Sequence, residues 1–228
     1  LGLGGLYVWA ALSPLTVLLA NALNAPVERA IARGYLNDAR RLLNASPRLT
    51  VIGITGSYGK TSVKNFLGAL LSARYNVLMT PESFNTPMGI VRTVREQLRP
   101  THEIFLAEMG AKQPGDIREL CELTRPRYGV ITAVGEQHLE TFHSLDNILH
   151  TKFELADAIP AGGRVFLNTG SEPIRAHRPS VTADAVTYAA DGSPADYTAA
   201  DIAVSGSGSS FTVTAPDGET RRYATRLL

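Results

Sequence analysis

Hydrophobic and polar positions alternate in short blocks along the middle of the chain. Brief apolar runs read as buried strands, and the segments between them carry apolar residues at helical spacing. Buried strands that alternate with helices indicate a mostly parallel sheet covered on both faces, so we predict an α/β fold. The predicted strands are 49–54, 76–79, 104–109, 128–133 and 165–168, and the predicted helices follow residue 62 and span 88–98, 116–123 and 144–159.

The N-terminal end has a different pattern. Residues 1–26 contain no charged side chain and are rich in Leu, Ala and Val, which is long enough for a helix that spans a bilayer. We therefore predict a membrane helix there, with a buried or interfacial helix as the alternative. Residues 27–48 read as an amphipathic basic helix and a linker. Their arginines predict that the rest of the chain is cytoplasmic, tethered to the inner face of the cell membrane.

The C-terminal end changes again after residue 170. Ser, Thr, Ala and Asp dominate, with period-two runs at 201–204, 210–215 and 221–227 and a turn signal between the last two. We predict antiparallel hairpins appended to the parallel sheet, within one domain over residues 49–228. The chain starts without a methionine and stops inside a predicted strand, so we expect it to be a piece of a longer protein.

Composition narrows the class of protein. The 228 residues are 44% hydrophobic, which is ample for a buried core. The 22 Lys and Arg residues nearly balance the 21 Asp and Glu residues, so no basic field favours a nucleic-acid partner. The one cysteine, Cys121, falls among apolar residues of a predicted helix, where we expect it to pack in the core of a protein from a reducing compartment.

The strongest chemical signal lies at residues 51–62. The order along the chain is a buried strand, a glycine-rich turn, Lys60, Thr61 and an amphipathic helix. Backbone N–H groups and the helix dipole of such a turn bind phosphate, the lysine neutralises it, and the threonine hydroxyl can ligate Mg²⁺. The pattern predicts a nucleoside triphosphate site. Its predicted contacts are Gly53, Thr55, Gly56, Ser57, Gly59, Lys60, Thr61 and Ser62.

Two further side chains follow strand ends. Glu108 ends the strand 104–109, and His138 lies just beyond the strand 128–133. Ligands of open α/β sheets bind at the carboxyl ends of the strands, where a carboxylate and an imidazole could hold a metal ion. The alternatives are a solvated carboxylate at Glu108 and an uninvolved loop histidine at His138. Lys152 lies on the predicted helix 144–159, and its alternative is an ordinary surface lysine.

The phosphate-loop pattern G-x-T-G-x-x-G-K-T-S at residues 53–62 resembles that of the Mur ligase family. These ATP-dependent enzymes add amino acids or dipeptides to peptidoglycan precursors. Ser-Phe-Asn-Thr-Pro-Met-Gly at 83–89, Glu-Met-Gly-Ala at 108–111 and Gln-His-Leu-Glu-Thr-Phe at 137–142 occur in the family's order. They look most like the branch that adds D-alanyl-D-alanine to the muramyl tripeptide.

The resemblance implies an ATP-dependent ligase that forms an amide bond through an acyl phosphate. It implies a muramyl-peptide acceptor, a D-amino-acid dipeptide and two Mg²⁺ ions. Thr61 and Glu108 would hold the first ion, and His138 and a carbamylated Lys152 the second. Lys60, His138 and Lys152 would be the catalytic residues, and Asn85 would line the cleft beside the γ-phosphate.

Two departures from the family leave alternatives open. The predicted membrane helix stands where family members carry a nucleotide-sugar-binding domain, which suggests a lipid-linked acceptor. The chain also stops before the family's adenine-contacting segment and C-terminal domain, so we expect the fragment alone to be inactive. A folylpolyglutamate-synthase-like ligase and a non-catalytic, membrane-tethered ATP-binding module remain as alternatives, whereas a GTPase or transporter has the wrong loop.

Overall fold

The computed structural model describes residues 2–136 and 139–226. Their strands form one nine-stranded sheet in the order β2-β3-β1-β4-β5-β6-β7-β8-β9. The strands are β1 (Thr50–Thr55), β2 (Val77–Met79), β3 (Ile104–Glu108), β4 (Tyr128–Ile131), β5 (Arg164–Asn168), β6 (Ala185–Ala189), β7 (Tyr197–Ser205), β8 (Gly208–Thr214) and β9 (Thr220–Thr225). The helices are α1 (Leu3–Asn44), α2 (Lys60–Leu71), α3 (Pro87–Gln97), α4 (Asp116–Thr124), α5 (Leu139–Phe142), α6 (Leu145–Asp157), α7 (Glu172–His177) and the 3-10 turn η1 (Arg178–Ser180).

The sheet has a parallel part and an antiparallel part. Neighbouring strands from β2 to β7 pair in parallel, and β7, β8 and β9 pair antiparallel. Strand β1 lies between β3 and β4, so its carboxyl end is flanked by the carboxyl ends of both neighbours. The predicted α/β fold with a mostly parallel sheet and appended antiparallel strands is confirmed.

Side chains that alternate along the central strands pack against helices on both faces. Val51 and Phe105 contribute to the larger core cluster, which also includes residues of α3, α4, α6 and α7. Ile54 and Leu106 point to the other face, where α2 packs with Val63 and its neighbours. Beside α2 an apolar groove of about 770 Å³ stays open over β4 to β7. Cys121 is buried in the larger cluster, as its sequence context predicts.

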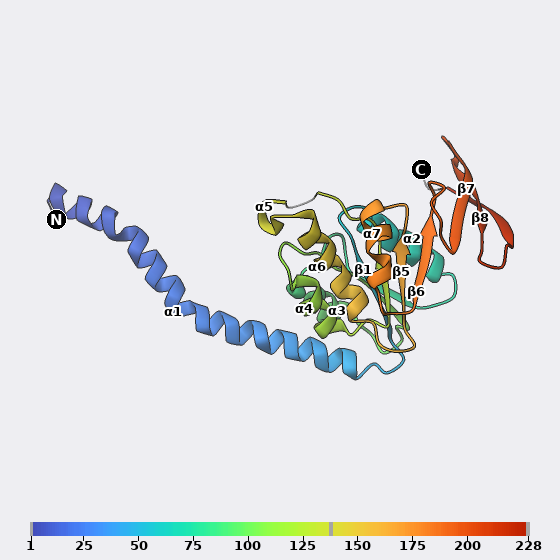
Figure 1. Ribbon diagram of the computed structural model, residues 1–228. Helices are drawn as coiled ribbons and strands as arrows, with labels where there is room; N and C mark the ends of the chain where they lie inside the picture. The colour runs from blue at the N-terminus through green and yellow to red at the C-terminus, as the bar shows by residue number, and fades with distance from the viewer. Residues whose placement is uncertain (1, 137–138, 227–228) are drawn as a thin grey trace.

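One long helix replaces the two N-terminal segments that the sequence suggests. Helix α1 runs through Pro14 and Pro26 and extends away from the sheet toward its N-terminus (Figure 1). Its C-terminal part joins the domain through Asp38, which accepts a hydrogen bond from Arg95 Nε of α3 at 2.9 Å. The same guanidinium lies 4.4 Å from the ring centre of Tyr35.

The predicted membrane helix over residues 1–26 needs correction. No helix in the described part of the chain is long and apolar enough to cross a membrane. Asn21 and Asn24 interrupt the apolar run, and Glu28 and Arg29 follow it within the same helix.

The chain after residue 170 also differs from its prediction. The hairpins exist, but α7 and the strand β6 precede them, and β6 pairs in parallel with both β5 and β7. Strand β6 lacks a continuous apolar run. Side-chain hydrogen bonds help to hold it in place. Thr187 donates from both its backbone N–H and its hydroxyl to Asp196 Oδ2, with a distance of 2.7 Å for each hydrogen bond.

The turn before β5 generates a stability prediction. A Cβ atom at Gly163 would lie 2.2 Å from the backbone oxygen of Arg127 and 2.8 Å from Ile159. We expect Gly163→Ala to lower the free energy of unfolding by about 1–3 kcal/mol, because the backbone must move to make room. Urea unfolding measures this change. Gly206→Ala, whose added Cβ meets nothing within 4 Å, is the control, and equal effects of the two substitutions would contradict the expectation.

Candidate functional site

The turn between β1 and α2 depends on two glycines in the left-handed region. Gly56 has φ of 147°, and Gly59, the residue that precedes α2, has φ of 79°. A Cβ atom at Gly56 would lie 2.1 Å from Thr132 Oγ1 and 3.0 Å from the backbone oxygen of Ala133. Glycine is therefore required at this position by both conformation and space.

Polar bonds fix the turn to the segment after β4. Ser57 donates from its backbone N–H to the Ala133 oxygen at 2.6 Å and from its hydroxyl to the Gly135 oxygen at 3.0 Å. Thr132 Oγ1 donates to the Tyr58 oxygen. The side chains of Ser57 and Thr132 thus hold the loop in shape, which leaves recognition of a phosphate to backbone N–H groups at the start of α2.

Lys60 is held over this loop. Its Nζ donates to the backbone oxygens of Gly56 at 2.8 Å and Ser57 at 3.2 Å. Burial lowers the pKa of Lys60, and attraction to Glu108 partly opposes that shift. A cation beside the N-terminus of a helix is suited to an anionic ligand.

A buried carboxylate gathers the side chains next to the loop. Glu108 ends β3, opposite Ile54 of β1 in the parallel register, and its residue is 1% exposed. Its Oε2 accepts a hydrogen bond from Thr61 Oγ1 at 3.0 Å, and its Oε1 accepts one from Asn85 Nδ2 at 3.2 Å. The structure thus brings together three of the side chains that the sequence singles out.

Lys64 is a fourth member that the sequence reasoning missed. Its Nζ lies 3.0 Å from Glu108 Oε2 and donates to the backbone oxygen of Glu82. The residue is 1% exposed, although it sits on a helix whose apolar positions alone marked the buried face. Helical spacing was the available signal, because a lysine four residues after Lys60 faces the same side of α2.

Lys152 is buried rather than on the surface. It lies on α6, is 3% exposed, and has its Nζ 5.9 Å from the ring centre of Phe142. Burial is the main cause that lowers its pKa to about 8, and repulsion from Lys60 adds to it. A fraction of Lys152 is therefore an uncharged, nucleophilic amine near neutral pH. His138 lies outside the described residues.

The oxygens of Thr61 and Glu108 fit a hard divalent cation. A hydroxyl and a carboxylate that already lie 3.0 Å apart are ligands that Mg²⁺ takes together with phosphate oxygens. Within residues 2–136 and 139–226, no group of three or more His, Cys, Asp and Glu side chains could hold a metal ion.

Two of the predicted nucleotide contacts take part in packing and hydrogen bonding within the sheet. Gly53 is inside β1 and pairs with Ala107 on one side and Gly129 on the other. A Cβ there would lie 2.8 Å from Leu155, so this glycine allows α6 to approach the sheet and does not belong to the loop. Thr55 is buried, and its hydroxyl donates to the Met109 oxygen at 3.0 Å. Ser62 is exposed in the first turn of α2.

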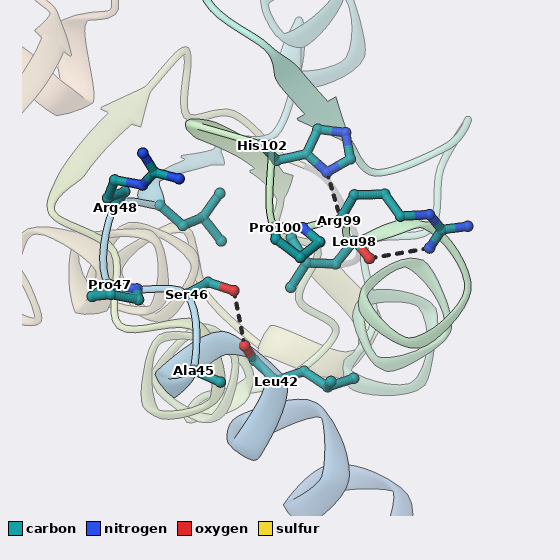
Figure 2. Close-up of a pocket in the computed structure, with 10 residues that line it drawn as sticks. Leu42, Ala45, Ser46, Pro47, Arg48, Leu98, Arg99, Pro100 and His102 are labelled. Atoms are coloured by element: carbon teal, nitrogen blue, oxygen red, sulfur yellow. Dashed lines mark hydrogen bonds between the residues drawn. The ribbon is translucent and has the colours of Figure 1, made fainter.

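A cavity of about 350 Å³ lies at the opposite edge of the sheet (Figure 2). Its lining comes from the α1–β1 link, including Arg48, and from the α3–β3 loop, including Arg99 and His102. His102 Nδ1 accepts a hydrogen bond from the Arg99 N–H at 2.9 Å. These segments precede β1 and β3, whereas the phosphate loop and Glu108 stand at the strands' carboxyl ends, so the cavity is separate from the candidate site.

Comparison with known proteins shows which family uses this arrangement. Residues 54–228 match the model of the Mur ligase middle domain. The chain belongs to the Mur ligase family. The resemblance to this family that the sequence motifs suggest is confirmed.

Two curated relatives of this chain share one name. The chain is 39% identical over 151 residues to the UDP-N-acetylmuramoyl-tripeptide–D-alanyl-D-alanine ligase of Mycobacterium leprae. The matched residues cover 64% of this chain and 29% of that protein. The chain is 34% identical over 163 residues to the Bacillus subtilis ligase of the same name, covering 72% of this chain and 35% of that protein. The chain therefore spans about a third of the length of these relatives.

Solved structures agree with the fold of this chain. MurF ligase from Thermotoga maritima in complex with ADP aligns with a TM-score of 0.76 at 27% identity, covering 85% of this chain and 44% of that one. MurF from Acinetobacter baumannii aligns with a TM-score of 0.78 at 24% identity, covering 86% of this chain and 42% of that one.

The loop between β1 and α2 generates a second stability prediction. We expect Gly56→Ala to destabilise the protein by about 1–3 kcal/mol more than Gly59→Ala. Both substitutions place alanine at a positive φ, but only the Cβ at position 56 would collide with Thr132 and the backbone of Ala133. Thermal unfolding of the two variants is the measurement, and equal losses would show that the loop can move aside.

Lys152 generates a pH prediction. Its pKa falls from an ordinary 10.5 to about 8 on folding, so between those values the unfolded chain binds a proton that the native protein lacks. The free energy of unfolding should therefore rise with pH across this window, by on the order of 3 kcal/mol relative to Lys152→Met. Below about pH 8 Lys152 is protonated in both the native and the unfolded protein. The difference in unfolding free energy between the wild-type protein and Lys152→Met is then independent of pH.

Denaturant unfolding of the wild-type protein and Lys152→Met at several pH values measures this difference. Burial raises the pKa values of Cys121 and Tyr188 to about 12, and these groups act in both proteins, so they cancel in the comparison. Parallel stability curves for the two proteins would contradict a lowered pKa at Lys152.

Proposed function

We propose that this chain is the ATP-binding core of a ligase that joins D-alanyl-D-alanine to a muramyl tripeptide. The observation that carries the proposal is the convergence of Lys60 and Thr61, at the start of α2, with Glu108 at the end of β3. The name shared by its relatives, at up to 42% identity, supports the choice of substrates. An ATP-dependent amide synthesis would proceed through an acyl phosphate on the acceptor.

Residues at the phosphate loop would bind and orient the nucleotide. N–H groups at the start of α2 would bind the phosphates, and Lys60 would neutralise charge on the phosphoryl group as it is transferred. Thr61 and Glu108 would hold Mg²⁺, which supplies charge neutralisation on the phosphate oxygens when bound. Asn85, which donates to Glu108, would orient that carboxylate and border the acceptor.

Lys152 and His138 would belong to a second cation position. A lysine with a pKa near 8 reacts with CO₂ through its uncharged amine, and the carbamate that forms is an oxygen ligand in place of a cation. The burial of Lys152, which is 3% exposed, would protect such a carbamate from water. Only the sequence motif around His138 supports its role.

Release of phosphate tests the proposed reaction. The protein in its full natural length, given Mg-ATP, a muramyl-tripeptide acceptor and D-alanyl-D-alanine, should release ADP and phosphate only when all components are present. Lys60→Ala and Glu108→Gln should each lower turnover by about 10²- to 10³-fold, because each removes charge stabilisation from the transferring phosphoryl group. His138→Ala should lower turnover as well.

Controls separate this reaction from its alternatives. Lys112→Ala changes an exposed lysine outside the cluster and should leave turnover unchanged. UDP-linked and lipid-linked muramyl peptides are compared as acceptors, and folate with glutamate tests the folylpolyglutamate-synthase-like reaction. Binding of ATP without phosphate release for any acceptor would favour a non-catalytic ATP-binding module and contradict the proposal.

A further inference from the structure

The pair of Lys64 and Glu108 is the most deeply buried charged contact in the described part of the chain. Side chains of the two residues are 2% and 1% exposed, and Nζ lies 3.0 Å from Oε2. Burying an unpaired carboxylate costs far more free energy than burying one with a cation at hydrogen-bond distance. Lys64 therefore meets the electrostatic requirement that Glu108 creates.

The ammonium of Lys64 is held firmly in place. It donates to the backbone oxygen of Glu82, a residue with φ of 41° in the left-handed region. It also extends from α2, whose next turn is fixed by the close approach of Gly68 to Met79. The ammonium is thus buried between Glu108 and the loop of residues 80–86, which also carries Asn85.

We propose that Lys64 makes metal binding at Glu108 conditional on the nucleotide. This inference rests on the proposed function, in which Thr61 and Glu108 hold Mg²⁺. The carboxylate oxygen nearest Thr61 is the same Oε2 that Lys64 contacts, so a cation between Thr61 and Glu108 would lie close to a fixed positive charge. Without phosphate, the charge of Glu108 is already balanced and the site offers a divalent cation no net attraction.

The phosphates of ATP reverse this balance. They bring several negative charges to the loop, where Lys60 and the N-terminus of α2 bind them, and they add oxygen ligands of their own. The protein would therefore take up metal and nucleotide together. Lys64 acts as a positioning residue, because it contacts the ligand Glu108 and not the phosphate.

Binding of Mn²⁺, followed by electron paramagnetic resonance of the free ion, tests the proposal without relying on turnover. The wild-type protein should show no stoichiometric site below about 1 mM Mn²⁺ alone, and a tight site when a non-hydrolysable ATP analogue is added. Lys64→Met removes the charge at similar length. It should bind Mn²⁺ without nucleotide at least about tenfold more tightly than the wild-type protein.

Three further variants make the result specific. Lys64→Gln keeps a donor for Glu82 and should behave like Lys64→Met. It therefore replaces Lys64→Met in the test if the methionine variant does not fold. Lys64→Met with Glu108→Gln should lose the gained site, and Lys112→Met, an exposed lysine, should match the wild-type protein.

Two outcomes would overturn the inference. One is equally tight Mn²⁺ binding by the wild-type protein with and without the nucleotide analogue. The other is unchanged nucleotide-free binding when folded Lys64→Met or Lys64→Gln is measured. Separate titration with the nucleotide analogue tests the proposed function, because its failure to bind leaves the nucleotide-free comparison of Lys64 variants intact.

Discussion

A carboxylate buried at the end of β3 determines how this part of the molecule is assembled. Glu108 is 1% exposed, and a charge in that position requires donors on both oxygens. Thr61 and Lys64 supply them from α2, and Asn85 supplies one from the loop that follows β2. One electrostatic requirement therefore fixes a helix, a loop and a strand end relative to one another.

The phosphate loop depends on the same strand order by a different means. Because β1 lies between β3 and β4, its carboxyl end meets Glu108 on one side and Thr132 on the other. The first neighbour contributes charge, and the second contributes hydrogen bonds to the loop. The parallel sheet thus separates two tasks, since β3 supplies the buried carboxylate and the segment after β4 maintains the loop's shape.

Much of this arrangement could be predicted from the sequence. Short apolar runs located the parallel strands, and the strand-end rule placed Glu108 beside Thr61. Helical spacing placed Lys64 on the same side of α2 as Lys60, but its burial could not be predicted, because burial of a charged residue depends on partners distant in the chain, here Glu108 and Glu82. Strand β6 was missed because Thr187 and Asp196 stabilise it with polar bonds rather than an apolar run. Residues 1–26 and 27–48 read as separate segments, yet α1 continues through Pro26.

Gly68 gives α2 a fixed height above the sheet. A Cβ atom there would lie 2.1 Å from the sulfur of Met79, so the helix rests directly on β2. Eight residues separate Gly68 from Lys60, which is about 12 Å along the helix axis. The resting point is thus remote from the loop, yet it sets where the first turn of α2 begins. A larger residue in place of Gly68 would push α2 away from β2. The start of the helix would then shift, and Lys60 and Thr61 would be displaced although the substituted residue contacts no ligand.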